Sequence, residues 1–229
     1  MITSSQTSFK YLDIIASFFV AILVVSNIAS SAKIVDIGIS LFSIPLAFDG
    51  GTLLFPLVYV LGDVLTEVYG FKTARRVIWT GFAAMALTAL VFFVLGILPP
   101  EENWESETGG AAYNAILGGM SYGGIVLASL TAYLAGEFSN AAVLSKLKVK
   151  MKGRLLFVRT IGSTLVGELL DTLIFVLIAS AAGVFGWELF WSLVLTNYIL
   201  KCGIEALMTP FTYWASRFLK RKEGVDVYD

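Results

Sequence analysis

This sequence contains no histidine, and it has a single cysteine, Cys202, among 229 residues. Without histidine, imidazole proton relays and histidine-containing metal sites are excluded, and one cysteine cannot form an intramolecular disulfide. Zinc-dependent and serine–histidine catalysis are therefore excluded. The sequence also has no Walker loop for ATP and no Gly-x-Gly-Asp protease signature. We expect no enzyme activity, no cofactor and no metal site.

Charged residues are also scarce, at 14%, whereas hydrophobic residues make up 57% and the mean hydropathy is +0.82. A soluble domain has about 25% charged residues, so this composition indicates an integral membrane protein whose first partner is the lipid bilayer. The 16 basic and 17 acidic side chains nearly balance, which gives no reason to expect a nucleic-acid partner. The polar N-terminus leads into an apolar run too long for a signal-peptide core, which predicts a retained first helix.

Long apolar runs fill most of the chain. A membrane-crossing helix needs about 20 predominantly apolar residues, and six segments meet that requirement. Their approximate bounds are 11–32, 51–70, 77–98, 121–145, 156–182 and 188–216. The fold class is therefore an all-α membrane protein with six transmembrane helices. Residues 1–229 are expected to form a single domain, since no linker separates a second one.

The loop charges predict the orientation, because cations collect in cytoplasmic loops. Basic residues gather before the first span, after the second and fourth spans, and at the end: Lys10, Lys72, Arg75, Arg76, Lys146 to Arg159, Arg217, Lys220, Arg221 and Lys222. The opposite side has only Lys33, and the loop after the third span holds four glutamates. Both termini are therefore predicted to be cytoplasmic. Three spans on each side of the acidic loop also allow two halves of inverted topology.

The loop between the first two spans has a different pattern. Residues 35–41 alternate apolar and polar side chains with period two, and Pro45 and Asp49-Gly50-Gly51 supply turn chemistry. A short external strand or hairpin is expected there.

Ionisable side chains inside the spans are the main functional signal. Each costs about 2.5–3.5 kcal/mol on insertion scales and usually marks a path or a site. The set considered inside the spans comprises six acids and one base: Asp63, Glu67, Glu137, Glu168, Asp171, Glu205 and Lys201. The alternating directions of the spans put these groups near the middle or the cytoplasmic half of the bilayer, which allows them to form one layer.

Helical spacing groups these side chains by face. Asn197, Lys201 and Glu205 are successive i, i+4 neighbours, and the pairs Glu137–Asn140 and Glu168–Asp171 are spaced i, i+3. Each group is expected to face the bundle interior, with Asn27 of the first span adding an uncharged donor and acceptor. Lys201 can neutralise one acid as part of a scaffold ion pair, and Arg159 can serve one more. The remaining acids require protons, a cation or a ligand with hydrogen-bond donors.

Five short motifs in order, taken with the six spans, resemble the queuosine-precursor transporter family of vitamin-uptake-like membrane proteins. They are SN in the first span, FPLVYVLGDVLTEVYGFKTARRVIW around the second, GEFSN in the fourth, RTIGSTLVGELLDTLIF in the fifth and KCGIEALMTP in the sixth. The resemblance covers residues 11–216. It implies import of a 7-deazaguanine precursor of queuosine across a bacterial inner membrane. It also implies a six-helix bundle similar to the substrate-binding subunits of energy-coupling-factor importers.

An acid-rich interior suits such a base, because carboxylates accept from adjacent N–H groups and amides or ammonium groups donate to a carbonyl. We assign substrate binding to Glu168, Asp171, Glu137, Asn140, Asn197, Lys201, Glu67 and Asn27, and coupling or gating to Asp63, Glu205, Arg75 and Arg159. We expect the base edge at Glu168 with Asp171, its oxygen at Asn140 or Asn197, and a cytoplasmic closure of Glu67 with Arg75 or Lys201. The aromatic candidates for stacking on the ring are Phe138, Tyr133, Phe175, Tyr198 and Trp191.

Two modes of transport remain open at this point. The chain is either a solitary carrier, ion-coupled or facilitative, or the substrate-binding component of an ATP-driven importer. Such components dock through small residues spaced by four, often alanines, on the first helix, and this first span has no Ala-xxx-Ala. The sequence therefore favours the solitary carrier. A scaffold without a ligand is disfavoured by the cost of the uncompensated acids.

Overall fold

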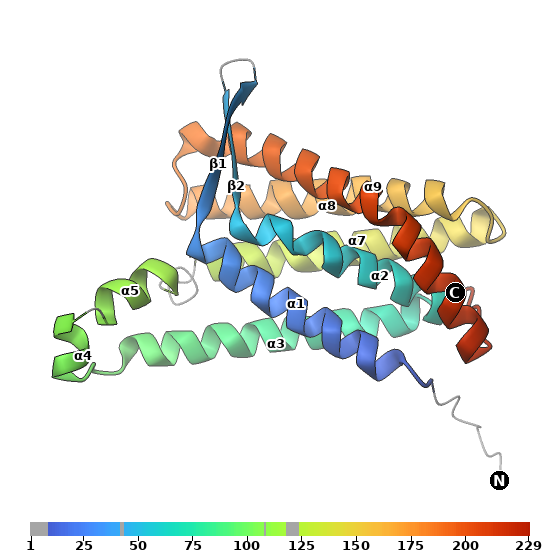
Figure 1. The fold of residues 1–229 in the computed structure, drawn as a ribbon, viewed down its shortest axis with the longest axis horizontal. Coiled ribbons are helices and arrows are strands. Elements are labelled where there is room, and N and C mark those ends of the chain that lie inside the picture. Colours follow the sequence, from blue (N-terminus) through green and yellow to red (C-terminus); the bar gives the residue numbers. More distant parts are fainter. Residues whose placement is uncertain (1–8, 42–43, 108, 118–123) are drawn as a thin grey trace, which may run out of the picture.

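The computed structural model describes residues 9–41, 44–107, 109–117 and 124–229 (Figure 1). Its long helices pack together in one bundle: α1 (Leu12–Ala32), α2 (Phe55–Tyr69), α3 (Phe71–Ile97), α7 (Gly124–Lys150), α8 (Leu156–Ala181) and α9 (Phe190–Glu223). Shorter elements connect them: strands β1 (Ile34–Leu41) and β2 (Ile44–Asp49), 3-10 turns η1 (Gly50–Leu53) and η2 (Trp187–Leu189), and helices α4 (Glu102–Glu107) and α5 (Gly109–Ile116).

The long helices coincide with the six predicted spans except at a few ends. α2 begins at Phe55 instead of residue 51, because Asp49 caps the 3-10 turn η1 that precedes it. α3 begins directly after Gly70, whose φ of +83° makes the sharp break between α2 and α3. α9 continues past residue 216 and ends before Gly224, which has a φ of +69°. The first residues of the fourth span, 121–123, lie outside the described residues.

The short helix α2 lies at the centre of the bundle. Thirteen of its fifteen residues are buried, and it contacts α1, α3, α7 and α9. Its acids, Asp63 and Glu67, are each only 1% exposed. The surrounding helices thus shield the two carboxylates from the outside of the bundle, as the cost of placing a charge in lipid requires.

The distribution of polar and apolar side chains is the reverse of that in a soluble protein. The six predicted acids of the spans are all at most 4% exposed, whereas large apolar side chains such as Leu207, at 81%, cover the outside. Within the described residues, α1, α3 and α8 are long and apolar enough to cross a membrane. An apolar exterior around a charged interior is stable in lipid and not in water, so this is a membrane protein. That all six long helices cross the bilayer stays a prediction.

The hairpin expected after the first helix is present. β1 and β2 pair antiparallel, and Ile34 is opposite Asp49, so the chain returns to the end of α1 from which it left. Figure 1 shows this hairpin projecting from the bundle. The pairing is important for the interior, because it brings Asp49 back against α1.

The opposite end of the bundle holds the start of α1 and the end of α9. The backbone N–H groups of Lys10 and Tyr11 both donate to the carboxylate of Glu223. The turn at Gly70 and the connection from α7 to α8 lie at this same end (Figure 1). The basic loops therefore share one end, which agrees with the charge pattern, and the assignment of that end to the cytoplasm stays a prediction.

Candidate functional site

The first part of the site is a buried ion cluster between α8 and α9. Lys201 Nζ lies 2.6 Å from Asp171 Oδ2 and 3.4 Å from Glu168 Oε2. The i, i+3 spacing on α8 puts both acids on the face toward α9. The shorter contact is a hydrogen bond, whereas the longer one is an ion-pair distance without hydrogen-bond geometry. Lys201 Nζ also lies 4.6 Å from the ring centroid of Phe55 on α2, so three helices meet at this ammonium group.

A third acid, Asp49, adjoins this cluster and was not among the predicted site residues. Its carboxylate accepts from Ser30 Oγ at 2.5 Å, Thr52 Oγ1 at 3.0 Å, Asn197 Nδ2 at 3.0 Å and the backbone N–H of Gly51 at 3.0 Å. Asp49 is 4% exposed. The sequence placed it in a turn outside the spans, and only the return of the hairpin brings it inside. Its one sequence signal was an isolated acid directly before a long apolar run.

These groups surround a small internal cavity. It is lined by Asn27, Ser30, Asp49, Phe55, Ser129, Ala132, Asp171, Phe175 and Lys201, which come from α1, β2, α2, α7, α8 and α9. Its volume is about 20 Å³, and a cavity of that size holds about one water molecule. The wall therefore offers two carboxylates, one ammonium, one amide and two aromatic rings, in a closed arrangement.

A group of acids without basic partners lies deeper, between α2, α7 and α9. Asn140 Nδ2 donates to Asp63 Oδ1 at 2.9 Å, and Thr164 Oγ1 donates to Glu205. Both carboxylate oxygens of Glu137 are buried with no hydrogen-bond partner in the described part of the chain. Buried carboxylates of this kind are stable only when a proton, a cation or a ligand donor neutralises them.

The end of the bundle that holds the start of α1 and the end of α9 is closed by a different ion cluster. Glu67 pairs with Arg159, and Lys220 Nζ lies 2.6 Å from Glu67 Oε1. The expected partners of Glu67 were Arg75 or Lys201, and this expectation is wrong. Arg75 lies on the exposed side of α3, and Lys201 is already held by Asp171, whereas Arg159 at the start of α8 faces the end of α2.

Residues 224–229 cover this cluster. Asp226 Oδ1 lies 2.6 Å from Lys148 Nζ and 2.9 Å from Lys220 Nζ. Asp229 accepts from the backbone N–H groups of Phe71 and Lys72, the first residues of α3. Partial burial raises the pKa of Asp226, but the hydrogen bonds from the two lysines outweigh it and hold the pKa below its ordinary value.

The predicted site residues thus fall into four groups. Asn27, Asp171 and Lys201 line the cavity, and Glu168 and Asn197 contact members of its wall. Glu137, Asn140, Asp63 and Glu205 form the deeper acidic group. Glu67 and Arg159 form the closure at the terminal end, and Arg75 is separate from all of them. The acids therefore occupy several depths instead of the single layer that the spacing allowed.

Of the aromatic candidates, only Phe175 lines the cavity. Tyr133 and Tyr198 donate to backbone oxygens, Phe138 packs on Trp79, and Trp191 is 61% exposed. Phe55, which we did not predict, supplies the second ring of the wall. It directly precedes Pro56 at the start of α2, and nothing in the sequence distinguishes it from other apolar residues.

A charged, closed site inside an apolar exterior is typical of a membrane transporter. Residues 49–215 match the family described as "Putative vitamin uptake transporter", and the chain belongs to that family. The match begins at Asp49, includes α2, α3, α7 and α8, and ends within α9 at residue 215. The family resemblance of the sequence motifs is confirmed.

Three bacterial relatives carry the more specific description. The "Probable queuosine precursor transporter" of Bacillus subtilis (strain 168) is 28% identical over 174 residues, which are 76% of this chain and 73% of the relative. The "Queuosine precursor transporter" of Escherichia coli (strain K12) is 26% identical over 188 residues, 81% and 79% of the two chains. The corresponding Haemophilus influenzae protein is 24% identical over 160 residues, 69% and 63%. No solved structure matches this chain.

Proposed function

We propose that this transporter imports a 7-deazaguanine precursor of queuosine across the bacterial inner membrane, and that the base binds in the cavity beside Lys201 and Asp171. The observation that carries the proposal is the composition of the cavity wall, with Asp49, Asp171, Lys201 and two aromatic rings. The names of the relatives support the same substrate class. The proposal includes six membrane crossings with both termini in the cytoplasm.

The wall chemistry matches the groups that a guanine-like base presents. Adjacent N–H donors on one edge of the base suit Asp171 or Asp49, and the carbonyl suits the ammonium of Lys201 or the amide of Asn27. Phe55 and Phe175 supply faces for the planar ring. The closed cavity holds about one water molecule, so the helices or side chains around it must move apart to admit a base.

The two remaining groups of acids suit steps other than base binding. Asp63, Glu137 and Glu205 have no basic partner within the described residues, so they are candidates to take up a proton or a cation during transport. The cluster of Glu67, Arg159 and Lys220 is the proposed cytoplasmic gate. A base leaves toward the cytoplasm only if these ion pairs separate.

Uptake of radiolabelled cyano- or aminomethyl-deazaguanine into proteoliposomes that contain only the purified chain tests this function. We expect the variants Asp171→Asn and Asp49→Asn to lower uptake about tenfold or more, since each removes a charged hydrogen-bond acceptor. Asp13→Asn on the exposed side of α1 makes the same chemical change outside the site and is expected to keep normal uptake.

The same preparation decides the mode of transport. Uptake driven by an imposed proton or sodium gradient supports the solitary ion-coupled carrier that we favour, and equilibration without a gradient supports a facilitative carrier. Binding without uptake indicates a component that needs an energising complex. Unchanged uptake in both site variants contradicts the assigned site, and neither binding nor uptake of either base contradicts the substrate class.

A further inference from the structure

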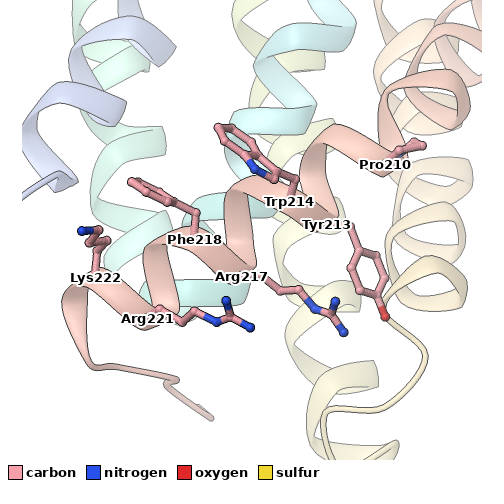
Figure 2. A pocket seen from close by; sticks show the side chains of 7 residues that line it. All are labelled: Pro210, Tyr213, Trp214, Arg217, Phe218, Arg221 and Lys222. Carbon is pink, nitrogen blue, oxygen red and sulfur yellow. The ribbon is translucent and has the colours of Figure 1, made fainter.

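A second hollow lies on the outside of the molecule, along the last turns of α9. This α9 groove is lined by Pro210, Tyr213, Trp214, Arg217, Phe218, Arg221 and Lys222, and its volume is about 580 Å³ (Figure 2). The cavity at Lys201 is far smaller and is lined by none of these residues, so the groove is a separate feature. Nothing in the proposed import of a base uses its residues.

The spacing of the groove residues explains why they share one face. Counted from Pro210, they recur at positions 3, 4, 7, 8, 11 and 12, the pattern of one stripe on an α-helix. The opposite face of α9 carries Thr209, Thr212, Ser216 and Leu219, and all four are buried in the bundle. The aromatic and basic side chains thus lie on the outer face, where a membrane protein meets lipid.

The aromatic part of the groove is exposed and ordered by stacking. Trp214 is 62% exposed and Phe218 is 38% exposed. Their ring centroids are 5.8 Å apart with an interplanar angle of 16°, and Phe211 packs on Trp214 at 5.7 Å. An apolar strip of this kind on a membrane protein suits an acyl chain or the glycerol region of a lipid.

The basic part of the groove has cations without acidic partners. Arg217, Arg221 and Lys222 are exposed, and within the described residues none of them forms an ion pair, whereas neighbouring Lys220 is held by Glu67 and Asp226. Arg217 lies 5.2 Å from the ring of Tyr213, and Lys222 lies 6.0 Å from the ring of Phe218. Figure 2 shows the guanidinium groups of Arg217 and Arg221 extending to the same side of α9.

We infer that the α9 groove binds an anionic phospholipid. The phosphate lies between Arg217 and Arg221, whose guanidinium groups extend to the same side of α9, because arginine donates to phosphate in bidentate fashion. The apolar part of the lipid lies along Trp214 and Phe218. A free phosphate ion would gain nothing from the aromatic strip, and a zwitterionic lipid would bring its own cation against the two arginines. The combination therefore favours an anionic lipid over both.

Native mass spectrometry of the purified chain with phosphatidylglycerol or phosphatidylcholine tests this inference. We expect the wild-type protein to retain phosphatidylglycerol preferentially. The variant Arg217→Gln/Arg221→Gln is expected to lower its affinity about tenfold or more, since each cation near the headgroup contributes to binding. Arg75→Gln/Arg76→Gln removes two exposed cations of α3 at the same end of the bundle and is the matched control.

The variant Trp214→Ala separates a lipid site from a phosphate site. It leaves every cation in place, so it is expected to weaken phosphatidylglycerol binding while weak binding of glycerol 1-phosphate stays unchanged. Equal retention of the two lipids, or an equal loss in the α3 control, would overturn the inference. Loss of glycerol 1-phosphate binding alone in the arginine variant, with lipid binding intact, would show a phosphate site instead. Monodisperse elution of each variant checks its folding.

Discussion

The side chain of Lys201 on α9 contacts both α2 and α8 in the interior of the bundle. It is 5% exposed, and its ammonium group contacts Asp171 and Glu168 of α8 and the ring of Phe55 of α2. A buried ion pair of this kind adds little stability compared with an apolar replacement of both side chains. Removing one partner, however, leaves the other charge unpaired in an interior of low dielectric constant, which is costly. A substitution of Lys201 is therefore expected to change both the stability of the bundle and the charge of the cavity wall.

We predict that Lys201→Met destabilises the protein by about 3–5 kcal/mol. Within the described residues, Lys201 is the one cation that pairs with Asp171 and Glu168, and the variant removes it. Thermal unfolding of the purified protein in detergent, followed by tryptophan fluorescence, measures the change. Lys33→Met removes an exposed lysine at the end of α1, and its effect should stay within about 0.5 kcal/mol.

The double variant Lys201→Met/Asp171→Asn tests the cause of that loss. With both charges removed, stability should recover relative to Lys201→Met alone, since no carboxylate at position 171 remains unpaired. A double variant that is less stable than either single variant would show that Lys201 acts through packing and not through its charge.

At the scale of elements, the close contact between α7 and α8 positions the site. A Cβ atom added at Gly136 of α7 would lie 2.7 Å from the Cβ of Asp171 and would also meet the hydroxyl of Tyr59. Gly167 of α8 faces the same contact, where an added Cβ would lie 2.8 Å from that of Asn140. The two glycines let the helix backbones approach, and this approach sets the distance between the deeper acids and Asp171.

We predict that Gly136→Ala destabilises the protein by about 1–3 kcal/mol and lowers uptake, because the added methyl group displaces Asp171 or Tyr59. Gly203→Ala on α9 is the matched control, since an added Cβ there meets nothing within 4 Å. In the control, the helix propensity of alanine favours stability by about 0.5–1 kcal/mol. Thermal unfolding and proteoliposome uptake measure the two effects, and equal stability of both variants would contradict the close-contact argument.

For the whole molecule, the charges of the two ends differ. The start of α1, the Gly70 turn, the α7–α8 connection and the end of α9 share one end and carry most of the basic residues. The other end holds the hairpin and the acidic helix α4. Such an asymmetry fixes the orientation of a membrane protein during insertion, and it is the physical basis for placing both termini in the cytoplasm.

Cysteine labelling in a Cys202→Ala background tests the predicted orientation. A cysteine at Asp36, exposed on the hairpin, should react with a membrane-impermeant maleimide in spheroplasts. A cysteine at Lys72, exposed at the start of α3, should react only after permeabilisation. If only Lys72→Cys reacts in intact spheroplasts, the orientation is the reverse of the predicted one. If both cysteines react equally, the hairpin and the start of α3 do not lie on opposite sides of the membrane.

The sequence by itself determined the class of protein, the approximate extent of the long helices and the inward face of the acids. Lipid imposes these features locally: an apolar run of sufficient length becomes a helix because its backbone must bond to itself, and a charge such as Glu168 must turn away from hydrocarbon. The alternation in residues 35–41 likewise indicated the hairpin, because strand periodicity is a local property.

Only the tertiary structure decided which charges meet. Lys201 pairs with Asp171 of another helix and not with Glu205, its neighbour on α9, and Glu67 pairs with Arg159 from 92 residues further along. Asp49 reaches the cavity only because β1 and β2 return the chain to α1. Such pairings depend on the relative depth and rotation of helices, which are set by packing contacts such as Gly136 against α8 and not by the period of any one segment.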